Sequence, residues 1–325
     1  MIKLGTNLPK HLVGSDHGAM RAFVTALEEM GYSYLCFGDH VLGADLSARP
    51  DWRPQRGKPP SQTLNDLQPE IFVLFGLLAG LTHTLELSSA ILISPQRQTA
   101  LLAKQAAEID VLTAGRLRLV IAVGWSDVEY EALGVDFHKR GALMDEQVDV
   151  LRRLWTEKSV TFNGQFHTIT AAGLNPLPTR SIPLWFGGQS EPVLRRVGRT
   201  GDGWFPFYPW FVEEQVRADF ETIKGYAREA GRDPKSIGLE GAFYWSDVRF
   251  DRPAGAREYP KSVDEAVEYA HIWKDIGANY LWVTTPWVGA EASTTPYSPS
   301  MLGSNDLDIR IEALREFKEA IGPNF

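Results

Sequence analysis

The feature that most constrains the fold is an alternation, repeated eight times along 325 residues, of a short apolar run and an amphipathic segment. The short runs have the length of buried strands, and the longer segments repeat apolar residues at three- and four-residue spacing, as helices do. The expected strands are Lys3–Leu8, Tyr34–Gly38, Leu85–Ile93, Arg116–Val123, Pro183–Phe186, Trp204–Pro206, Ile237–Tyr244 and Tyr280–Thr284. The expected helices are Asp16–Met30, Glu70–Leu81, Thr99–Leu112, Met144–Trp155, Glu191–Val197, Phe211–Ala230, Val263–Ile276 and Leu307–Ile321.

Eight such units with no linker-like break predict an α/β fold, a (β/α)8 TIM barrel that forms a single domain over residues 1–325. An open doubly wound sheet is the alternative, although it would usually show fewer units or a break in composition. Insertions are expected after strands 2, 4, 7 and 8. They are a loop at 41–68, a hairpin at 159–170 around Asn163-Gly164, and loops at 247–260 and 285–305.

Composition excludes some classes of binding partner. A net charge of −8 argues against nucleic acid, which needs a concentrated basic surface. The longest apolar run, Ile71 to Leu81, has 11 residues and is too short to span a bilayer, so no membrane partner is expected. The N-terminus lacks the apolar core of a signal peptide, and the single cysteine, Cys36, lies in an apolar strand. These features predict a cytoplasmic protein with Cys36 as a small core residue.

In a barrel of this class, the active site lies where the strands end and the following loops begin. Asp39-His40 follows the second strand and Gly124-Trp125 follows the fourth. His40 is the candidate catalytic residue, because an imidazole can exchange a proton near neutral pH. Asp39 could orient its ring or raise its pKa, although neighbouring residues on a strand point to opposite faces. A structural histidine that caps the strand end is the alternative.

A second candidate site follows the fifth strand, at Gly187-Gly188-Gln189-Ser190. Glycines let a ligand approach the backbone, and the free N–H groups at the start of a helix attract a phosphate. Ser190 is expected to cap the helix, with Pro192 in its first turn. The alternative is a tight strand-to-helix turn that needs glycine. No paired metal-ligand motif, dinucleotide-binding glycine fingerprint or phosphate-loop sequence occurs, so no metal is expected.

Seven segments, taken in order, resemble the bacterial-luciferase-like superfamily of flavin- and coenzyme F420-dependent oxidoreductases, and most closely its short F420-type group. These segments are Phe37–His40, Ser89–Pro95, Lys104–Arg116, Val123–Trp125 with Glu129–Gly134, and Pro183–Gly188 with Gly201–Trp204. The resemblance is strong over residues 1–207 and weak beyond them. No single segment is specific, but the ordered set is.

The resemblance implies a site for each part of the cofactor. Its phosphate would lie on Gly187, Gly188, Gln189 and Ser190, helped by the backbone of Val123, Gly124 and Trp125. Its ring would rest on Ala90 and Ile91, where the superfamily often has a non-proline cis peptide, here near Ala90–Leu92. His40 would be the ring-side histidine. One departure is Trp125, because sugar-phosphate dehydrogenases of the superfamily have an acidic residue there, so their substrate is not carried over.

Three functions remain open on the sequence. The first is an oxidoreductase that uses coenzyme F420 for hydride transfer, with His40 as proton donor or acceptor. The second is a monooxygenase that uses reduced FMN and oxygen, and the third is a flavin-binding protein without turnover. The substrate is expected to be a small apolar or aromatic molecule, because aromatic residues occur in the irregular loops. They are Trp52, Tyr208, Trp210, Trp245 and Trp287.

The helix expected at 70–81 is apolar on every side, whereas an outer barrel helix needs one apolar stripe. A second subunit or the 41–68 loop must cover the surplus face. The superfamily commonly pairs through the helices after strands two and three. We therefore expect a homodimer through the 70–81 and 99–112 helices.

Overall fold

The computed structural model describes residues 1–55, 57–60, 62–243, 250–286, 306–323 and 325. Its order of strands and helices is that of a (β/α)8 barrel, the predicted fold class. The chain divides into two compact units, one of residues 1–36 and 185–325 and the other of residues 37–184. We call them unit 1 and unit 2 and describe each by itself. The single domain stays a prediction.

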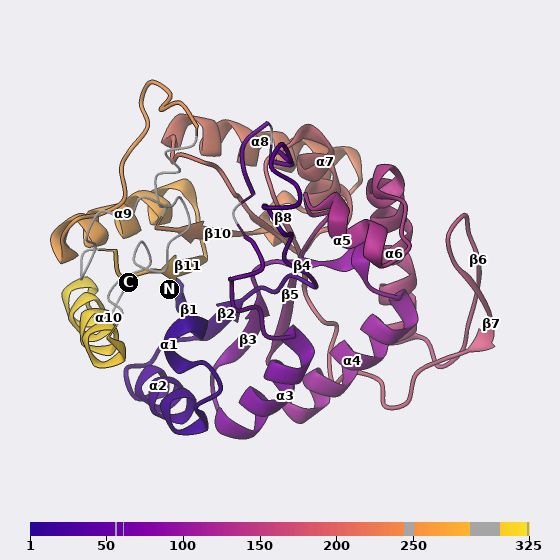
Figure 1. The fold of residues 1–325 in the computed structure, drawn as a ribbon, viewed down its shortest axis with the longest axis horizontal. Helices are drawn as coiled ribbons and strands as arrows, with labels where there is room; N and C mark the ends of the chain where they lie inside the picture. The colour runs from indigo at the N-terminus through magenta and orange to yellow at the C-terminus, as the bar shows by residue number, and fades with distance from the viewer. Residues whose placement is uncertain (56, 61, 244–249, 287–305, 324) are drawn as a thin grey trace. The chain divides into compact units, whose positions relative to one another are not determined.

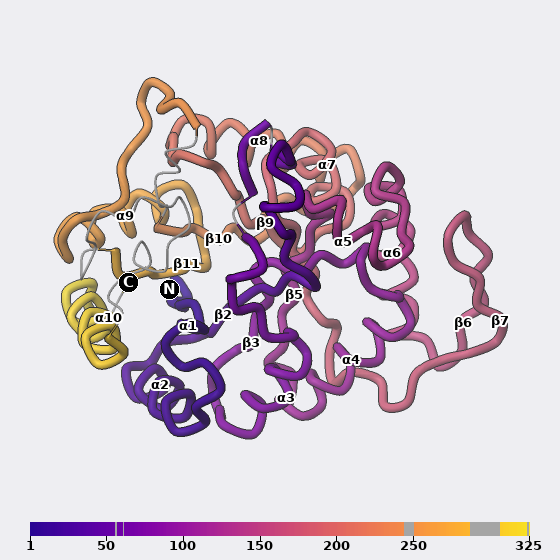
Figure 2. The backbone as a smooth tube through the Cα atoms, viewed as in Figure 1, coloured from indigo at the N-terminus to yellow at the C-terminus, as the bar shows by residue number. Residues whose placement is uncertain are grey.

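Unit 1 contains a parallel sheet in the order β2-β1-β11-β10-β9-β8. Its strands are β1 (Lys3–Asn7), β2 (Tyr34–Phe37), β8 (Leu184–Gly187), β9 (Gly203–Phe205), β10 (Gly238–Ala242) and β11 (Tyr280–Val283). Its α-helices are α1 (Lys10–Val13), α2 (His17–Glu29), α7 (Glu191–Thr200), α8 (Glu213–Glu229), α9 (Val263–Ile276) and α10 (Leu307–Ile321). The N- and C-termini lie side by side, joined by a backbone hydrogen bond between residues 2 and 325 (Figures 1 and 2).

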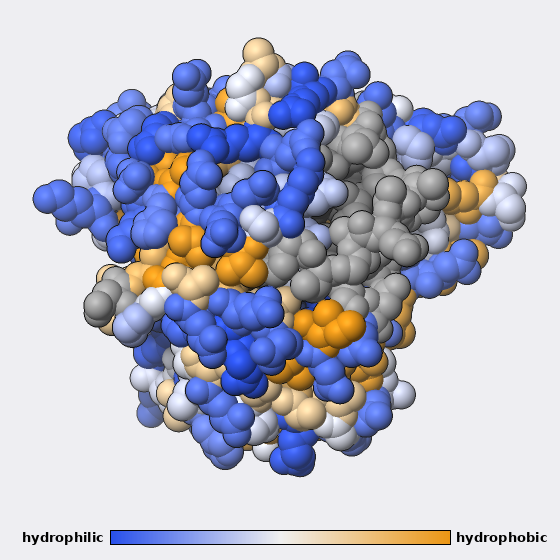
Figure 3. Space-filling view, turned by 90° about the vertical axis from the view of Figure 1, so that its left-hand side faces the viewer, coloured by the Kyte–Doolittle hydropathy of each residue, from blue (hydrophilic) through white to orange (hydrophobic). Residues whose placement is uncertain are grey.

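Large aromatic side chains fill unit 1 against glycines. The indole of Trp185 would lie 2.2 Å from a Cβ at Gly203 and 2.4 Å from one at Gly238, so neither position has room for a side chain. Trp273 of α9 is fully buried, as is Phe317 of α10. The face that carries these helices is largely hydrophilic (Figure 3), as expected for helices that turn one stripe inward.

Unit 2 contains the parallel strands β3 (Glu86–Ser89), β4 (Leu92–Ile93) and β5 (Leu117–Ala122), of which β5 pairs with both others. Its α-helices are α3 (Ile71–Leu81), α4 (Thr99–Leu112), α5 (Asp127–Ala132) and α6 (Arg140–Thr156). The antiparallel hairpin of β6 (Val160–Asn163) and β7 (Thr168–Ala172) projects beyond α4 and α6 (Figure 1). Short 3-10 turns follow β4 at Ser94–Gln96 and precede α6 at Phe137–Lys139, and a third in unit 1 is Pro234–Ser236.

The third strand of the barrel is interrupted where the sequence predicts one continuous strand. The peptide between Ala90 and Ile91 is cis, which confirms the non-proline cis bond expected near Ala90–Leu92. Gly38 fits against it, because a Cβ there would lie 2.7 Å from the nitrogen of Ile91. The hydroxyl of Ser89 accepts from the N–H of Val120 and donates to its carbonyl, which replaces ladder bonds at the break.

Most other expected elements are confirmed to within a few residues, and α4, α9 and α10 match their expected bounds. Cys36 is fully buried and forms no disulfide within the described residues, which fits the predicted small core residue. Two local details are wrong. Ser190 makes no side-chain cap on α7. The turn of the hairpin lies at Gln165-Phe166 rather than at Asn163-Gly164, because the N–H of Gly164 donates to the carbonyl of His167. The predicted loops at 247–260 and 285–305 fall partly outside the described residues, as do Trp245 and Trp287.

The helix α3, which is apolar on every side, buries most of its side chains. Phe75, Ile71 and Leu78 are fully buried. Val73 is the exception, with 74% of its surface exposed. Gly76 and Gly80 lie on the same side, and a Cβ added to either would meet nothing within 4 Å. The surplus apolar face is therefore a narrow strip of small residues beside Val73.

Candidate functional site

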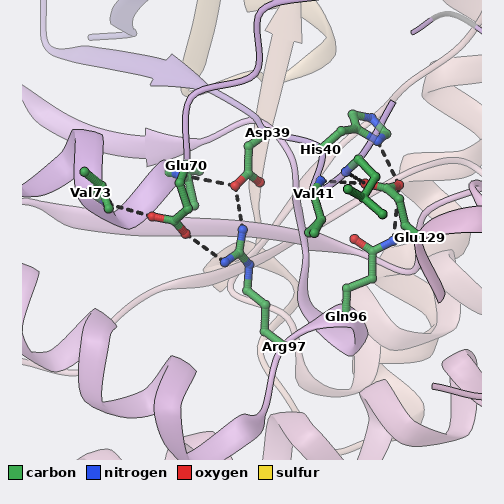
Figure 4. A network of polar contacts seen from close by, with 10 residues as sticks. Asp39, His40, Val41, Glu70, Val73, Gln96, Arg97 and Glu129 are labelled. Atoms are coloured by element: carbon green, nitrogen blue, oxygen red, sulfur yellow. Dashed lines mark hydrogen bonds and ion pairs between the residues drawn. The ribbon is translucent and has the colours of Figure 1, made fainter. Parts of the chain in front are cut away.

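His40 lies just after β2 in unit 2, and its ring is held by a glutamate from α5 (Figure 4). The distance from Nδ1 of His40 to Oε2 of Glu129 is 2.9 Å. Only 13% of the His40 side chain and 1% of the Glu129 side chain are exposed. Glu129 lies in one of the segments that resemble the superfamily, but no role was predicted for it. Glu129 could have been predicted from the sequence, because it is an acidic residue in the region that follows Gly124-Trp125.

Four groups converge on the Glu129 carboxylate. Oε1 accepts from the backbone N–H of Val41 at 2.6 Å and of Leu42 at 3.3 Å, and Oε2 also accepts from Nε2 of Gln96 at 3.3 Å. Burial alone would raise the pKa of Glu129. The hydrogen bond and charge of His40, with the Leu42 and Gln96 donors, outweigh burial and lower that pKa below its usual range. Glu129 is therefore ionised at neutral pH.

An ionised carboxylate fixes which imidazole nitrogen carries the proton. Because Glu129 can only accept, neutral His40 donates from Nδ1, and Nε2 keeps its lone pair. None of the described residues hydrogen-bonds Nε2. His40 can therefore take a proton at Nε2 and give it back, while Glu129 stabilises the imidazolium that forms.

Asp39 does not orient His40, contrary to one sequence expectation. Its carboxylate accepts from Nη2 of Arg97 at 2.6 Å and from the N–H of Ile71, at the start of α3, at 3.2 Å. Arg97 also donates to Glu70 at 2.8 Å (Figure 4). Because consecutive residues point to opposite sides, the Asp39 side chain contacts the start of α3, whereas the His40 side chain contacts α5. Among the described contacts, the orienting role belongs to Glu129.

Trp125 lies against His40, with their ring centroids 5.2 Å apart. The glycine before it, Gly124, has a φ of +66°, and a Cβ there would lie 2.8 Å from Ile93. A side chain at this position would therefore be strained and would clash. The carbonyl of Val123 accepts from the hydroxyl of Tyr130 at 2.7 Å, which fixes this strand end.

The predicted phosphate site lies in unit 1, between β8 and α7. Gly188 has a φ of +120°, its N–H donates to Phe205, and its carbonyl accepts from the indole of Trp204 at 2.7 Å. The N–H groups of Gln189 and Ser190 make no hydrogen bond within the described part of the chain. Two unused donors at the start of a ten-residue helix fit a phosphate. Gly188 supplies the turn rather than a donor.

The described residues hold no group of three or more His, Cys, Asp or Glu side chains that could bind a metal ion. No described helix combines the length and the apolar character that a bilayer crossing requires.

Comparison with known proteins decides the family. The family model described as luciferase-like monooxygenase matches residues 3–249. The chain belongs to this family. Luciferase-like proteins are oxidoreductases or monooxygenases, and relatives of this chain include an FMNH2-dependent monooxygenase and an F420-dependent dehydrogenase.

Two curated relatives and one solved structure illustrate the activities found among similar proteins. Pyrimidine monooxygenase RutA of Allorhizobium ampelinum is 35% identical over 192 residues, or 56% of this chain and 50% of the relative. F420-dependent glucose-6-phosphate dehydrogenase of Kineococcus radiotolerans is 27% identical over 270 residues, or 78% and 75%. The crystal structure of long-chain alkane monooxygenase LadA matches with a TM-score of 0.74 at 11% identity, over 100% and 93% of the chains, and shares the fold. The chain spans about half the length of the first curated relatives it matches.

Proposed function

We propose that the protein is an oxidoreductase that binds coenzyme F420 and transfers a hydride to or from a small organic substrate. The observation that carries the proposed oxidoreductase chemistry is the His40–Glu129 pair, in which Nδ1 is held and Nε2 is left with a lone pair. The choice of F420 is supported by 27% identity with an F420-dependent glucose-6-phosphate dehydrogenase over 78% of this chain. Hydride transfer at a C–O group needs a proton to move at the oxygen, and Nε2 of His40 can move it. Bound F420 would supply the hydride chemistry.

In this proposal, each residue around His40 has a separate role. Glu129 holds the tautomer of His40 and stabilises its charged form, so that the ring can return the proton at each turnover. Gln96 and the N–H groups of Val41 and Leu42 keep Glu129 ionised inside the protein.

The proposed site for the cofactor phosphate is supported by a different observation. The unused N–H groups of Gln189 and Ser190 at the positive end of α7 support a phosphate there. Ser190→Asp tests this, because a carboxylate at the helix start favours the helix but repels an anion. We expect cofactor affinity to fall at least about tenfold, or 1.4 kcal/mol, with helix content kept. Ser190→Asn is the neutral control and should bind normally. Normal binding by Ser190→Asp would remove the site.

A monooxygenase that uses reduced FMN is the second candidate. The 35% identity with pyrimidine monooxygenase RutA favours it, as does 32% identity with an FMNH2-dependent dimethylsulfone monooxygenase of Pseudomonas fluorescens. The proton-handling pair of His40 and Glu129 would serve either cofactor. A flavin-binding protein without turnover would have no use for that pair.

Cofactor titration separates the two enzymes. The purified protein is titrated with F420 and with FMN, each in its oxidised and reduced form, and the dissociation constants are compared by fluorescence. We expect F420 to bind more tightly and no oxygen uptake. Tighter binding of reduced FMN, together with oxygen uptake in an oxygen electrode, would reverse the assignment.

We also propose a homodimer through the outer faces of α3 and α4. Val73 on α3 and Leu101 on α4 are 74% and 54% exposed, and such apolar surface usually marks an interface. Light scattering at micromolar concentration should give about twice 36.3 kDa. Val73→Glu should give monomers with unchanged helix content, whereas Val73→Thr should remain dimeric. A monomeric wild-type protein would contradict the proposal.

A further inference from the structure

Three aromatic rings form a row in unit 2, and both ends of the row are tied to the same short helix. The ring centroid of Trp125 lies 5.2 Å from that of His40 and 6.0 Å from that of Trp52. His40 donates to Glu129, and Nε1 of Trp52 donates to Oδ1 of Asp127 at 2.8 Å. Asp127 and Glu129 are two residues apart on α5. The row is therefore fixed at both ends before any ligand binds.

Trp52 belongs to the 41–68 insertion, and further contacts hold that insertion on α5. Val41 and Leu42 donate to Glu129, and Arg49 lies 3.5 Å from Glu131. The Arg49 pair is exposed at both partners and contributes little by itself. Together with the bond from Trp52 to Asp127, these contacts place the indole of a long loop beside Trp125, which in turn lies against His40.

The faces of the row are suited to a flat apolar group. The N–H edges of Trp52 and His40 point at the carboxylates of α5, so these two rings offer π surface rather than donors to a ligand. Neighbouring rings are tilted, by 48° between His40 and Trp125 and by 42° between Trp125 and Trp52, so a flat group that stacks on one indole meets the other at an angle. Trp52 and Trp125 are each half-buried within the described residues, so part of each indole stays accessible. Rings that are already fixed lose little conformational entropy when a ligand stacks on them.

We propose that Trp52, held by Asp127, and Trp125 form the binding wall for a planar aromatic substrate whose reacting C–O group lies at Nε2 of His40. The assignment of the reaction rests on the proposed function, whereas the wall itself does not. For an aromatic alcohol, the carbon gives a hydride to the oxidised deazaflavin and the hydroxyl gives its proton to Nε2, which leaves the carbonyl product. The wall selects the substrate by flatness, and Asp127 is a positioning residue that acts through Trp52.

A matched pair of probes tests the wall without turnover. 2-Naphthol and decahydro-2-naphthol share a carbon skeleton and a hydroxyl, but only the first is flat. Calorimetric titration should show 2-naphthol bound about tenfold more tightly, in the range expected when it stacks on one indole and packs against the other at an angle. Trp52→Ala should remove most of that preference, and Trp52→Phe, which keeps a ring, should retain about half of it on a logarithmic scale. Equal affinities for the two probes in the wild-type protein would overturn the proposal.

Asp127 has its own controls. Asp127→Ala should weaken 2-naphthol binding about threefold by freeing the indole, and Asp127→Asn, which still accepts from Nε1 of Trp52, should restore it. Asp149→Ala removes an exposed carboxylate elsewhere in unit 2 and should change nothing. If Asp127→Ala bound 2-naphthol as tightly as the wild-type protein, Asp127 would not be a positioning residue.

The same titration is repeated with saturating F420 and with saturating FMN. 2-Naphthol should bind alongside either cofactor with little change in affinity. Competition with the cofactor would show that the wall receives the cofactor ring and would overturn its assignment to substrate. Because binding is the readout, an inactive protein that still prefers 2-naphthol would refute the proposed function and leave the wall intact.

Discussion

Unit 2 contains two histidine–glutamate pairs that are alike in almost every respect except at one nitrogen. His40 lies 2.9 Å from Glu129 and His167 lies 2.7 Å from Glu146, in each case through Nδ1. The two histidine side chains are 13% and 14% exposed. Each glutamate also accepts from backbone N–H groups, of residues 41 and 42 in one pair and 165–167 in the other.

The difference lies at Nε2. In His167 this nitrogen is 2.5 Å from the hydroxyl of Thr99, which also accepts from Gln147. Both ring nitrogens of His167 are therefore engaged, and the pair fastens the hairpin loop to α4 and α6. None of the described residues bonds Nε2 of His40. A histidine–carboxylate pair thus indicates proton chemistry only when its outer nitrogen is left available.

Replacing each histidine by alanine should produce the largest difference in turnover between the two pairs. His40→Ala should lower turnover roughly 10²- to 10⁴-fold, the usual contribution of a general acid or base, with cofactor affinity unchanged. His167→Ala should keep turnover within about threefold, because its ring only fastens a loop. Rates are followed by the absorbance of F420 with a panel of aromatic alcohols. Equal losses in the two variants would make His40 structural.

Glu129→Gln should lower turnover roughly 10²-fold without loosening the 41–42 backbone. The amide oxygen can still accept from Val41 and Leu42, but the amide nitrogen now faces Nδ1 of His40 and donates to it. The proton of the neutral ring then moves to Nε2, and the lone pair needed for catalysis is lost. Glu146→Gln is the matched control and should leave turnover unchanged. An active Glu129→Gln enzyme would show that the tautomer does not matter.

Glu146→Ala should loosen the hairpin loop only. Its carboxylate accepts from the N–H groups of Gln165, Phe166 and His167, so we expect these three amides to exchange with solvent about tenfold faster or more. Hydrogen exchange followed by mass spectrometry measures this, with Asp149→Ala as the control. Unchanged exchange at 165–167 would mean that the loop is held by other contacts.

The smallest effect concerns pH. The hydrogen bonds from His40 and its neighbours outweigh burial and hold the pKa of Glu129 below its ordinary value of 4.5. A folded-state pKa below the unfolded value gives stability that is present above about pH 4.5 and is lost as the pH falls through the folded value. Urea unfolding from pH 7 to pH 3 should therefore show a flatter dependence for Glu129→Gln than for the wild-type protein. Parallel curves would contradict this linkage.

The alternation of apolar runs and amphipathic helices was sufficient to predict the fold, because periodicity reports which face of an element is buried. The bounds of α4, from Thr99 to Leu112, follow from that pattern and the glycine that ends it. The hairpin turn was missed because Asn163-Gly164 is a local signal, and the carboxylate of Glu146, which receives the loop, lies outside that local pattern. The absent Ser190 cap has the same origin, since a capping residue type does not fix its side-chain direction.

The sequence indicated His40 as a candidate but not the glutamate that holds it, and the catalytic role of His40 stays a prediction. His40 could be found because it directly follows a strand at the end where barrels place their chemistry. Glu129 could not be paired with it, because the two are 89 residues apart and only folding brings α5 to the loop after β2. Asp39 was the nearer carboxylate in sequence, but the alternation of side chains turned it to Arg97 instead. Contacts between strand ends are set by tertiary packing, which no local pattern contains.

The most direct test of the account is the tautomer of the two histidines, measured by ¹⁵N NMR on histidine-labelled protein at neutral pH. We expect neutral His40 to carry its proton on Nδ1, with an unprotonated Nε2 whose signal inverts to the other tautomer in Glu129→Gln. His167 should be unaffected by that substitution. A wild-type His40 with its proton on Nε2 would contradict the claim that Glu129 presents a proton acceptor to the substrate.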